Sequence, residues 1–277
     1  MTLSPDVLVL PAFTEAEYTG DASEVDPWLA HYEFDRTLDV DGLVYPLRLT
    51  TENGLALTST GIGKSAAATT VAALAATCDL SETTILSVGI AGCRPNAGTL
   101  GSVFLADWVV DWDIKLRIGD TTGPMQWLVD DYAWQLDEPL VDRATAAARE
   151  VELADSEAAR TIRDRYDDSR QPTVDVGPTV CGDEVYHGTD TAAQVETLCE
   201  FYGIQGFATT EMEDAGTATA LDRFGLLEQY ISVRAAANFD REPPGGDPAE
   251  SITHDVFDLG VENAFRVGQR LVEEFTD

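Results

Sequence analysis

Residues 55–92 read LALTSTGIGKSAAATTVAALAATCDLSETTILSVGIAG. Short apolar runs and glycine turns surround one alanine-rich run that favours a helix. The parts in order are the strand candidate Leu55–Thr60, the turn Gly61-Ile62-Gly63, the helix candidate Ser65–Thr77, the strand candidate Thr84–Val88 and the turn Gly89-Ile90-Ala91-Gly92. Strand, glycine turn, helix and strand form the repeating unit of an α/β fold, so we expect a sheet flanked by helices.

The chain before this stretch contributes two more strand candidates. Val7–Leu10 is a continuous apolar run that ends at Pro11, which is typical of a strand buried on both faces. Leu43–Leu49 is separated from Leu55–Thr60 by the turn signal Glu52-Asn53-Gly54, so these two are predicted to form a hairpin.

The chain after this stretch continues the α/β pattern. Further elements are predicted at Gly101–Val110 (strands), Glu138–Leu153, Gln194–Tyr202 and Met212–Phe224 (helices), Gln229–Ala235 (strand) and Val256–Phe275 (helix). Residues 114–137 lack a clean period and contain several turn residues, so we expect an insertion or a lid loop there. A chain of 277 residues can form one large domain, and we expect a single domain over 1–277.

Acidic residues dominate the charge of the chain. The 50 Asp and Glu residues against 17 Lys and Arg give a formal net charge of −33, and the only lysines are Lys64 and Lys115. Such a surface repels nucleic-acid phosphates and anionic lipid head groups, which argues against both as partners. Concentrated salt screens self-repulsion of this size, so the composition predicts a halophilic protein.

The sequence carries no signal for a membrane span, a secretion leader or a metal site. No run approaches the roughly 18 apolar residues that span a bilayer, and Met1–Leu10 lacks the basic start of a signal peptide. The cysteines at positions 78, 93, 181 and 199 stand apart, without the spacing of metal ligands. We therefore expect a cytoplasmic protein with neither a metal nor a cofactor.

Gly63-Lys64-Ser65 before a helix matches the end of a phosphate-binding P-loop. A P-loop also needs a glycine five residues before its Gly-Lys pair, and that position is Thr58. No later strand ends in an aspartate suited to holding magnesium. The glycines are therefore predicted to permit a tight turn, and an NTPase is disfavoured.

Three further segments lie where α/β sheets bind ligands. Gly89-Ile90-Ala91-Gly92 follows a strand and is either a simple turn or a place where a ligand reaches backbone amides. Thr210-Glu211-Met212-Glu213-Asp214 opens a helix, and its acids either cap that helix or bind a vicinal diol such as that of ribose. Arg234–Asp240 leaves a buried strand, as a ligand site or as a surface loop.

Taken in order, these segments resemble the nucleoside phosphorylase superfamily along most of the chain. The resemblance rests on Thr60–Ala68, Gly89–Gly92 with Gly98–Val103, Cys181–Tyr186, Glu211-Met212-Glu213 and Arg234–Asp240. Within the superfamily, residues 235–245 look most like the group called purine nucleoside permeases, a name that records a transport phenotype. The resemblance implies a three-layer phosphorylase-type α/β fold, with a central mixed sheet flanked by helices. It also implies cleavage of the bond between a purine base and ribose.

The resemblance further implies which residues bind the substrate. Ile90, Ala91 and Gly92 match a substrate-binding segment, and Val185 and Tyr186 match the strand end that borders the base. Glu211, Met212 and Glu213 match the motif that binds ribose, with Glu213 on the hydroxyls and Met212 beneath the ring.

The base-recognition segment departs from the nucleosidase pattern at one position. Nucleosidases and hexameric phosphorylases carry an aspartate four residues after the arginine that matches Arg234, and this chain has Asn238 there, comparable to the asparagine of trimeric phosphorylases. An amide can donate a hydrogen bond to purine N7 at any pH, so we assign Asn238 to the base. Asp240 is expected to be the acid or a supporting group, and needs burial to hold a proton.

The attacking group separates hydrolysis from phosphorolysis. Glu15 lies just past the first strand, near the position where nucleosidases keep the carboxylate that activates water, and it favours hydrolysis. Phosphate as a co-substrate would need cationic or amide groups, for which Arg48 and Arg94 are candidates by position only. A purine nucleoside-binding protein without chemistry, serving uptake, is the alternative. Superfamily members usually complete their sites across subunits, so a homo-oligomer is expected.

Overall fold

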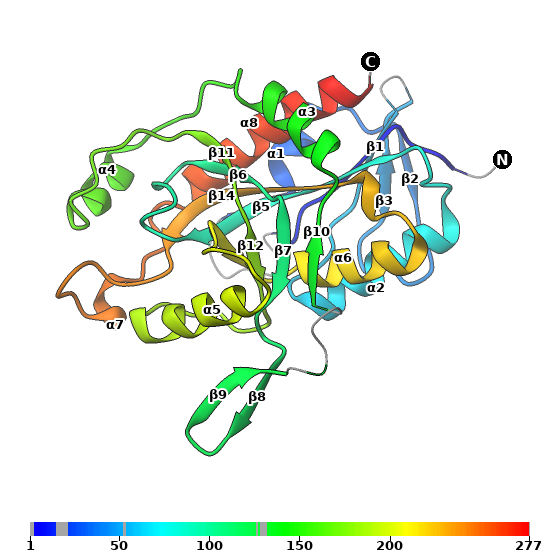
Figure 1. The fold of residues 1–277 in the computed structure, drawn as a ribbon. Coiled ribbons are helices and arrows are strands. Elements are labelled where there is room, and N and C mark those ends of the chain that lie inside the picture. Colours follow the sequence, from blue (N-terminus) through cyan, green and yellow to red (C-terminus); the bar gives the residue numbers. More distant parts are fainter. Residues whose placement is uncertain (1–2, 15–21, 52–53, 126, 128–131, 277) are drawn as a thin grey trace.

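The structure is a computed structural model that describes residues 3–14, 22–51, 54–125, 127 and 132–276. Within this part of the chain, twelve strands form one mixed sheet and two more form a separate hairpin. Helices cover both faces of the sheet (Figure 1). The expected α/β fold, with a central mixed sheet between helices, is confirmed.

The central sheet is built around β5 (Thr84–Cys93), which pairs in parallel with β1 (Val7–Leu10) and with β14 (Tyr230–Phe239). The path of neighbours runs through β10 (Ala133–Gln135), β7 (Trp108–Asp111), β12 (Thr179–Cys181), β13 (Thr209–Glu211), β5, β1, β4 (Leu55–Leu57), β3 (Leu47–Leu49) and β2 (Arg36–Leu38). Off this path, β6 (Val103–Leu105) pairs with β14 and with β11 (Val174–Val176).

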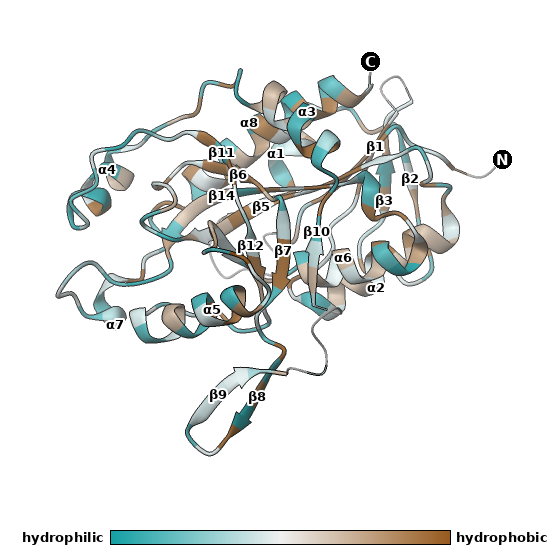
Figure 2. Ribbon diagram, viewed as in Figure 1, coloured by the Kyte–Doolittle hydropathy of each residue, from teal (hydrophilic) through white to brown (hydrophobic). Residues whose placement is uncertain are grey.

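The helices divide between the two faces of the sheet. They are α1 (Asp26–His31), α2 (Lys64–Thr77), α3 (Glu138–Ala148), α4 (Glu157–Asp164), α5 (Thr189–Phe201), α6 (Asp214–Phe224), α7 (Pro248–Ser251) and α8 (Phe257–Thr276), with a 3₁₀ turn at Leu227–Gln229. In Figure 1, α1, α3 and α8 lie on one face and α2 and α6 on the other. The hydrophobic colouring of Figure 2 gathers on the strands between them.

Strand β1 explains why the central strands read as continuous apolar runs. Val7 and Val9 pack into a core that includes residues of α3 and α8, whereas Leu8 and Leu10 pack into a core that includes residues of α2 and α6. Successive side chains of a strand point to opposite faces, so both faces must be apolar. The predicted strand at Val7–Leu10 is confirmed, as is the antiparallel pairing of β3 with β4.

Two segments expected to be turns or loops are strands. Gly89–Gly92 does not end β5, which continues to Cys93, and Arg234–Phe239 is the second half of β14. The turn prediction is wrong here because these two segments pair with each other along their length, with one irregularity between Ala236 and Asn238. Local glycine content cannot reveal a hydrogen-bonded neighbour that lies far away in the sequence.

Residues 114–137, expected as an insertion or lid loop, contain regular structure. β8 (Lys115–Ile118) and β9 (Thr121–Pro124) form an antiparallel hairpin that extends from the body of the molecule (Figure 1). Ala133–Gln135 then joins the central sheet as its terminal strand, β10. Residue 126 and residues 128–131 lie outside the described part of the chain, and a lid role stays a prediction.

Candidate active site

A pocket of about 380 Å³ opens among the ends of β1, β5, β12, β13 and β14. That volume lies in the range of small-molecule sites and suits a nucleoside. Its lining is mostly apolar and includes several carboxyl groups: Ala12, Phe13, Glu24, Ile62, Ile90, Ala91, Gly92, Glu184, Val185, Tyr186, Thr210, Glu211, Met212, Glu213, Asn238, His254 and Phe257.

The pocket brings together most of the residues that the sequence singled out. The lining contains Ile90, Ala91, Gly92, Val185, Tyr186, Glu211, Met212, Glu213 and Asn238. These residues come from β5, β13, β14 and the loop after β12, which are separated by up to half the chain. Their convergence follows from the sheet order, because β5 lies between β13 and β14.

Two predicted catalytic residues are not placed in the pocket. Asp240 is fully buried, and its carboxylate accepts hydrogen bonds of 2.8 Å from Arg241 Nε and Nη2, so it faces its neighbour and does not line the pocket. Burial raises the pKa of Asp240, but the Arg241 guanidinium opposes that effect. Glu15 lies outside the described residues.

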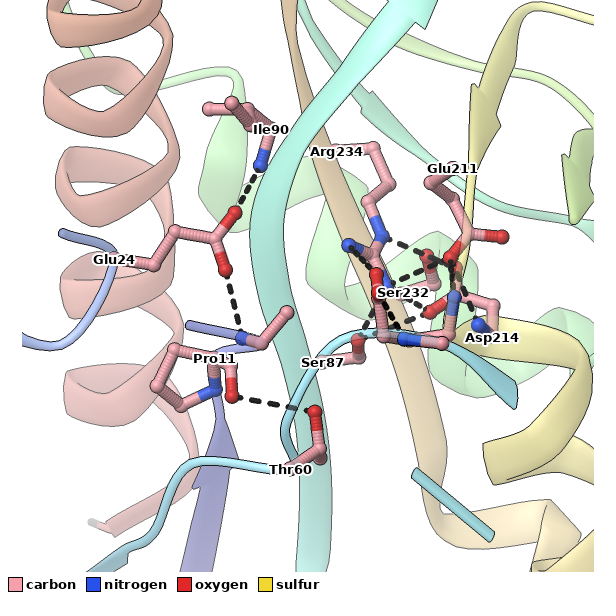
Figure 3. A network of polar contacts seen from close by, with 12 residues as sticks. Pro11, Glu24, Thr60, Ser87, Ile90, Glu211, Asp214, Ser232 and Arg234 are labelled. Carbon is pink, nitrogen blue, oxygen red and sulfur yellow. Dashed lines mark hydrogen bonds and ion pairs between the residues drawn. The ribbon is translucent and has the colours of Figure 1, made fainter. Parts of the chain in front are cut away.

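A buried arginine anchors the acidic motif. Arg234 Nη2 lies 3.1 Å from Glu211 Oε2, Arg234 Nη1 lies 3.5 Å from Glu213 Oε2, and Arg234 is also paired with Asp214. Figure 3 shows this cluster between β14 and the start of α6. Arg234 is 2% exposed, so its charge is compensated by these carboxylates rather than by water.

Asp214 is the main counter-ion of Arg234. Its carboxylate also accepts hydrogen bonds from Ser87 Oγ at 3.0 Å, Tyr230 OH at 2.8 Å and Ser232 Oγ at 2.5 Å. Burial opposes its ionisation, but Arg234 and these donors outweigh burial and lower the pKa of Asp214. Asp214 therefore stays ionised and satisfies the buried cation from beneath the pocket.

The two pocket-lining acids of the motif are held by backbone amides. Glu211 Oε2 accepts from the N–H groups of Glu213 at 2.7 Å and Asp214 at 2.8 Å. Glu213 Oε1 accepts from the N–H of Gly63 at 3.0 Å. Among the described residues, nothing hydrogen-bonds the buried Glu211 Oε1, which is therefore available to a ligand hydroxyl.

Crowding of carboxyl groups shifts the pKa values of this motif. Burial, reinforced by the charge of Asp214, raises the pKa of Glu211 to about 8. Burial also raises the pKa of Glu213, opposed by Arg234 and by the Gly63 N–H. One arginine cannot neutralise three carboxylates, so the cluster holds protons near neutral pH.

Glu24 is a lining carboxyl residue that the sequence did not single out. Its carboxylate accepts a hydrogen bond of 2.7 Å from the N–H of Ala12. It accepts another of 2.7 Å from the N–H of Ile90 (Figure 3). Burial raises the pKa of Glu24 to about 7, against the attraction of Arg234. It thus changes charge near neutral pH, as a general base should.

The position of Glu24 depends on a glycine in β5. A Cβ atom at Gly89 would lie 2.4 Å from Glu24 Oε1, so a side chain there would displace the carboxylate. Gly89 was a visible signal, since a glycine within a strand marks a close approach. Nothing in the sequence identifies Glu24 as the group that approaches, because it is one of 50 acidic residues.

Lysine and arginine are absent from the described lining of the pocket, which includes one histidine, His254. The residues outside the described part (1–2, 15–21, 52–53, 126, 128–131 and 277) include no lysine or arginine either. Arg48 lies on β3, and Arg94 pairs with Glu196 at 3.1 Å; neither is a lining residue.

The described residues contain neither a grouped set of metal ligands nor a membrane-spanning helix. In the described ranges, no three His, Cys, Asp or Glu side chains are grouped as metal ligands. Nor does any described helix have both the length and the apolar character required to cross a bilayer.

Comparison with known proteins identifies the family. The model of the purine nucleoside permease (NUP) family matches residues 4–133 and 123–277, which together span nearly the whole chain. The chain belongs to the purine nucleoside permease family. A probable purine nucleoside permease of Schizosaccharomyces pombe is 26% identical over 300 residues, which cover 92% of this chain and 86% of that protein. The Candida albicans purine nucleoside permease is 28% identical over 260 residues, covering 80% of this chain and 64% of that protein.

Solved structures with the same fold include a nucleosidase and a futalosine hydrolase. The 5′-methylthioadenosine/S-adenosylhomocysteine nucleosidase of Neisseria meningitidis, in complex with methylthio-immucillin-A, superposes with a TM-score of 0.68 at 17% identity and covers 98% of this chain and 99% of its own. Futalosine hydrolase of Helicobacter pylori has a TM-score of 0.68 at 16% identity, covering 99% and 98%. This purine nucleoside permease family member therefore has the nucleosidase fold.

Proposed function

We propose that the protein hydrolyses the N-glycosidic bond of purine nucleosides, with Glu24 as the group that accepts a proton from the attacking water. The single observation that carries this proposal is the position of Glu24. A buried carboxylate with a pKa of about 7 lines the nucleoside-sized pocket, held by two backbone amides. A nucleosidase needs such a base, and the shared fold of the nucleosidases adds support.

The same geometry disfavours phosphorolysis. Phosphate binding requires free amide donors or cationic side chains. The amides of Ala12 and Ile90 already donate to Glu24, and the Gly63 amide donates to Glu213. The described lining contains no lysine or arginine, so the carboxyl groups of Glu24, Glu211 and Glu213 would face an inorganic phosphate without a basic side chain to offset them.

Two side chains, Glu24 and Asn238, take part in the chemical step. As the bond from C1′ to purine N9 breaks, its electron pair leaves with the base and positive charge develops on the sugar. Water bonds to C1′ and its proton passes to Glu24, while Asn238 donates a hydrogen bond to N7 of the departing base. The base finally gains the proton, so water is consumed and free purine and ribose are formed.

The acidic motif, Glu211-Met212-Glu213, binds the sugar. Glu213 Oε1 accepts from the Gly63 amide, and its Oε2, which lies 3.5 Å from Arg234 Nη1, also accepts from a ribose hydroxyl. Glu211, whose pKa is raised to about 8, holds a proton at neutral pH and donates a hydrogen bond from Oε1 to the second hydroxyl oxygen. The partial negative charge of the motif also stabilises the cationic sugar of the transition state. Met212 packs beneath the ring, and Val185 and Tyr186 border the base.

The test is product analysis with and without phosphate. The protein, in concentrated KCl, is incubated with adenosine, inosine and guanosine, and free base, ribose and ribose 1-phosphate are separated by chromatography. Hydrolysis gives base and ribose in equal amounts in both buffers. Ribose 1-phosphate formed only with phosphate would replace the proposal by phosphorolysis.

The relatives' names motivate one alternative, a nucleoside-binding protein that supports uptake without chemistry. It predicts nucleoside binding by calorimetry with no product in either buffer. It also predicts that Glu24→Gln leaves nucleoside affinity unchanged, whereas the hydrolase loses turnover.

A further inference from the structure

The turn that resembles the end of a P-loop lies next to the acidic motif Glu211-Met212-Glu213. Gly63 and Lys64 begin α2, and the helix has no side-chain cap of its own and no acid in its first turn. Two carboxylates from elsewhere accept its first amides: Glu213 Oε1 from Gly63 N at 3.0 Å and Asp183 Oδ1 from Lys64 N at 2.8 Å. Both also complement the positive end of the helix dipole.

The side chain of Lys64 is fixed by two more carboxylates. Its Nζ lies 3.0 and 3.1 Å from the two oxygens of Asp111 and 3.3 Å from Asp113 Oδ2. Asp113 Oδ2 in turn accepts from the N–H of Asp183 at 3.0 Å. The Lys64 and Asp111 side chains are only 13% and 8% exposed, so this ion pair is largely shielded from water.

These carboxylates come from the ends of three neighbouring strands. Asp111 ends β7 and pairs in register with Cys181 of β12, which pairs in register with Glu211 of β13. Parallel strands place their carboxyl ends at one edge of a sheet, where α/β proteins bind ligands. Hydrogen bonds and an ion pair therefore connect residues 63–64 to the carboxyl ends of β7, β12 and β13.

The turn also has no room to shift toward α6. A Cβ atom at Gly216 would lie 2.1 Å from the carbonyl oxygen of Lys64, and one at Gly63 would lie 3.1 Å from Asp183 Oδ1. The N–H group of Gly63 is thus held in place at the site by contacts from α6, from β7 and from the loop after β12.

We infer that Lys64 and Asp183 are positioning residues for ribose binding, holding the Gly63 amide where it orients Glu213 toward the sugar hydroxyls. This inference rests on the proposed nucleoside site, and it assigns a task to a lysine that touches neither substrate nor reacting atoms. The inference predicts a selective effect when either residue is replaced. Ligands that carry ribose lose affinity, whereas the free base, which does not contact Glu213, keeps its affinity.

The experiment compares two helix-cap variants, each of which removes one carboxylate acceptor. Asp183→Ala removes the acceptor of Lys64 N, and Asp137→Ala removes the N-cap of the distant helix α3, whose carboxylate accepts from Leu140 N at 2.9 Å. Lys64→Met tests the lysine directly, but it leaves Asp111 buried without its cation, and this variant can fail to fold. Asp183 is exposed, so Asp183→Ala tests the inference even if Lys64→Met does not fold.

The measurements are KM and kcat for inosine, with the inhibition constant of hypoxanthine, in concentrated KCl. For Asp183→Ala we expect KM to rise about five- to tenfold, the equivalent of one typical hydrogen bond, with the hypoxanthine constant unchanged. Asp137→Ala should leave all three values at the wild-type level. Equal losses for nucleoside and base, or an unchanged KM in Asp183→Ala, would overturn the inference.

Failure of the proposed function can be distinguished from failure of the inference about Lys64 and Asp183. If the wild-type protein binds inosine without cleaving it, dissociation constants of inosine and hypoxanthine replace the kinetic values and test the same selectivity. If the wild-type protein binds neither compound, nor adenosine and adenine, both the function and the inference are overturned.

Discussion

Each carboxyl group in or next to the pocket takes its properties from the atoms around it. Asp214 receives hydrogen bonds from two serines and a tyrosine as well as from Arg234, which lower its pKa. Glu24 receives two backbone amides, which do not offset its burial, so its pKa rises to about 7. Identical side-chain chemistry therefore gives a permanent counter-ion in one place and a base that titrates near neutrality in the other.

Replacing Glu24 with glutamine should remove the base while keeping its size. We expect kcat for nucleoside hydrolysis to fall by about two to four orders of magnitude, with KM changed little, because the group acts on water rather than on the sugar. Steady-state kinetics with inosine checks this. Glu184→Gln is the matched control, since Glu184 is an exposed carboxylate lining the same pocket, and it should retain most of the activity. A similar loss in both variants would contradict the role of Glu24.

The pH dependence of hydrolysis should follow the ionisation of Glu24. Only the ionised carboxylate can accept a proton from water, and burial raises its pKa to about 7. The rate should therefore rise with pH through a midpoint near 7, rather than near the usual value of a glutamate. A pH profile of kcat/KM between 5 and 9 measures this limb, because kcat/KM reports the ionisation of the free enzyme, and the limb should be absent in Glu24→Gln. A limb that persists there belongs to another group.

Single residues also show the limits of reading function from local sequence. The acid-methionine-acid motif and Asn238 could be located, because their neighbours in the chain carry a recognisable pattern. Glu24 could not be located, since its role depends on amides of Ala12 and Ile90, and Ile90 is far away in the sequence. Asp240 was predicted from the sequence to be the acid or a supporting group, but its carboxylate accepts hydrogen bonds from the adjacent Arg241.

At the level of elements, the site depends on how closely α2 and α6 approach. Both helices start at the pocket, α2 with the Gly63 amide and α6 with the acidic motif. Their contact places Gly216 against the carbonyl of Lys64, where only a glycine fits. The distance between these helix starts sets the distance between Gly63 and Glu213.

Gly216→Ala should separate the two helices. Its Cβ would lie 2.1 Å from a backbone oxygen, so one helix must move, and we expect a loss of about 1–3 kcal/mol in the free energy of unfolding together with a higher KM. Denaturant unfolding and kinetics measure the two effects. The control is Gly123→Ala in the β8–β9 hairpin, where nothing lies within 4 Å of the added Cβ. If both variants unfold at the same denaturant concentration as the wild type, the close contact is not needed.

At the scale of the whole molecule, the surface charges and the buried charges have different effects. The formal charge of −33 affects the solvated surface, while the buried cations pair with nearby carboxylates, as Arg234 does with Asp214. Repulsion among the surface acids opposes compaction when few salt ions are present, and it is screened as the Debye length falls from about 10 Å at 0.1 M to about 3 Å at 1 M.

Stability should therefore increase with KCl. We expect the thermal midpoint to rise steadily from 0.1 M toward molar KCl, because screening relieves repulsion in the folded state more than in the expanded unfolded chain. Differential scanning calorimetry across a KCl series gives the midpoints. Sucrose at matched water activity serves as a control for solvent effects that do not involve charge. A midpoint independent of KCl would contradict the prediction of a halophilic protein.

The sequence by itself determined the α/β class, the order of the main elements and the acidic surface. Strand Val7–Leu10, helix α2 and the helix after the acidic motif follow from apolar periodicity and helix propensity, which are local properties. Only the tertiary structure extended β5 and β14 through their glycine and alanine segments, placed Glu24 on two amides and turned Asp240 away from the pocket. These outcomes depend on pairing between distant segments and on burial of charge, and neither quantity exists until the sheet has formed.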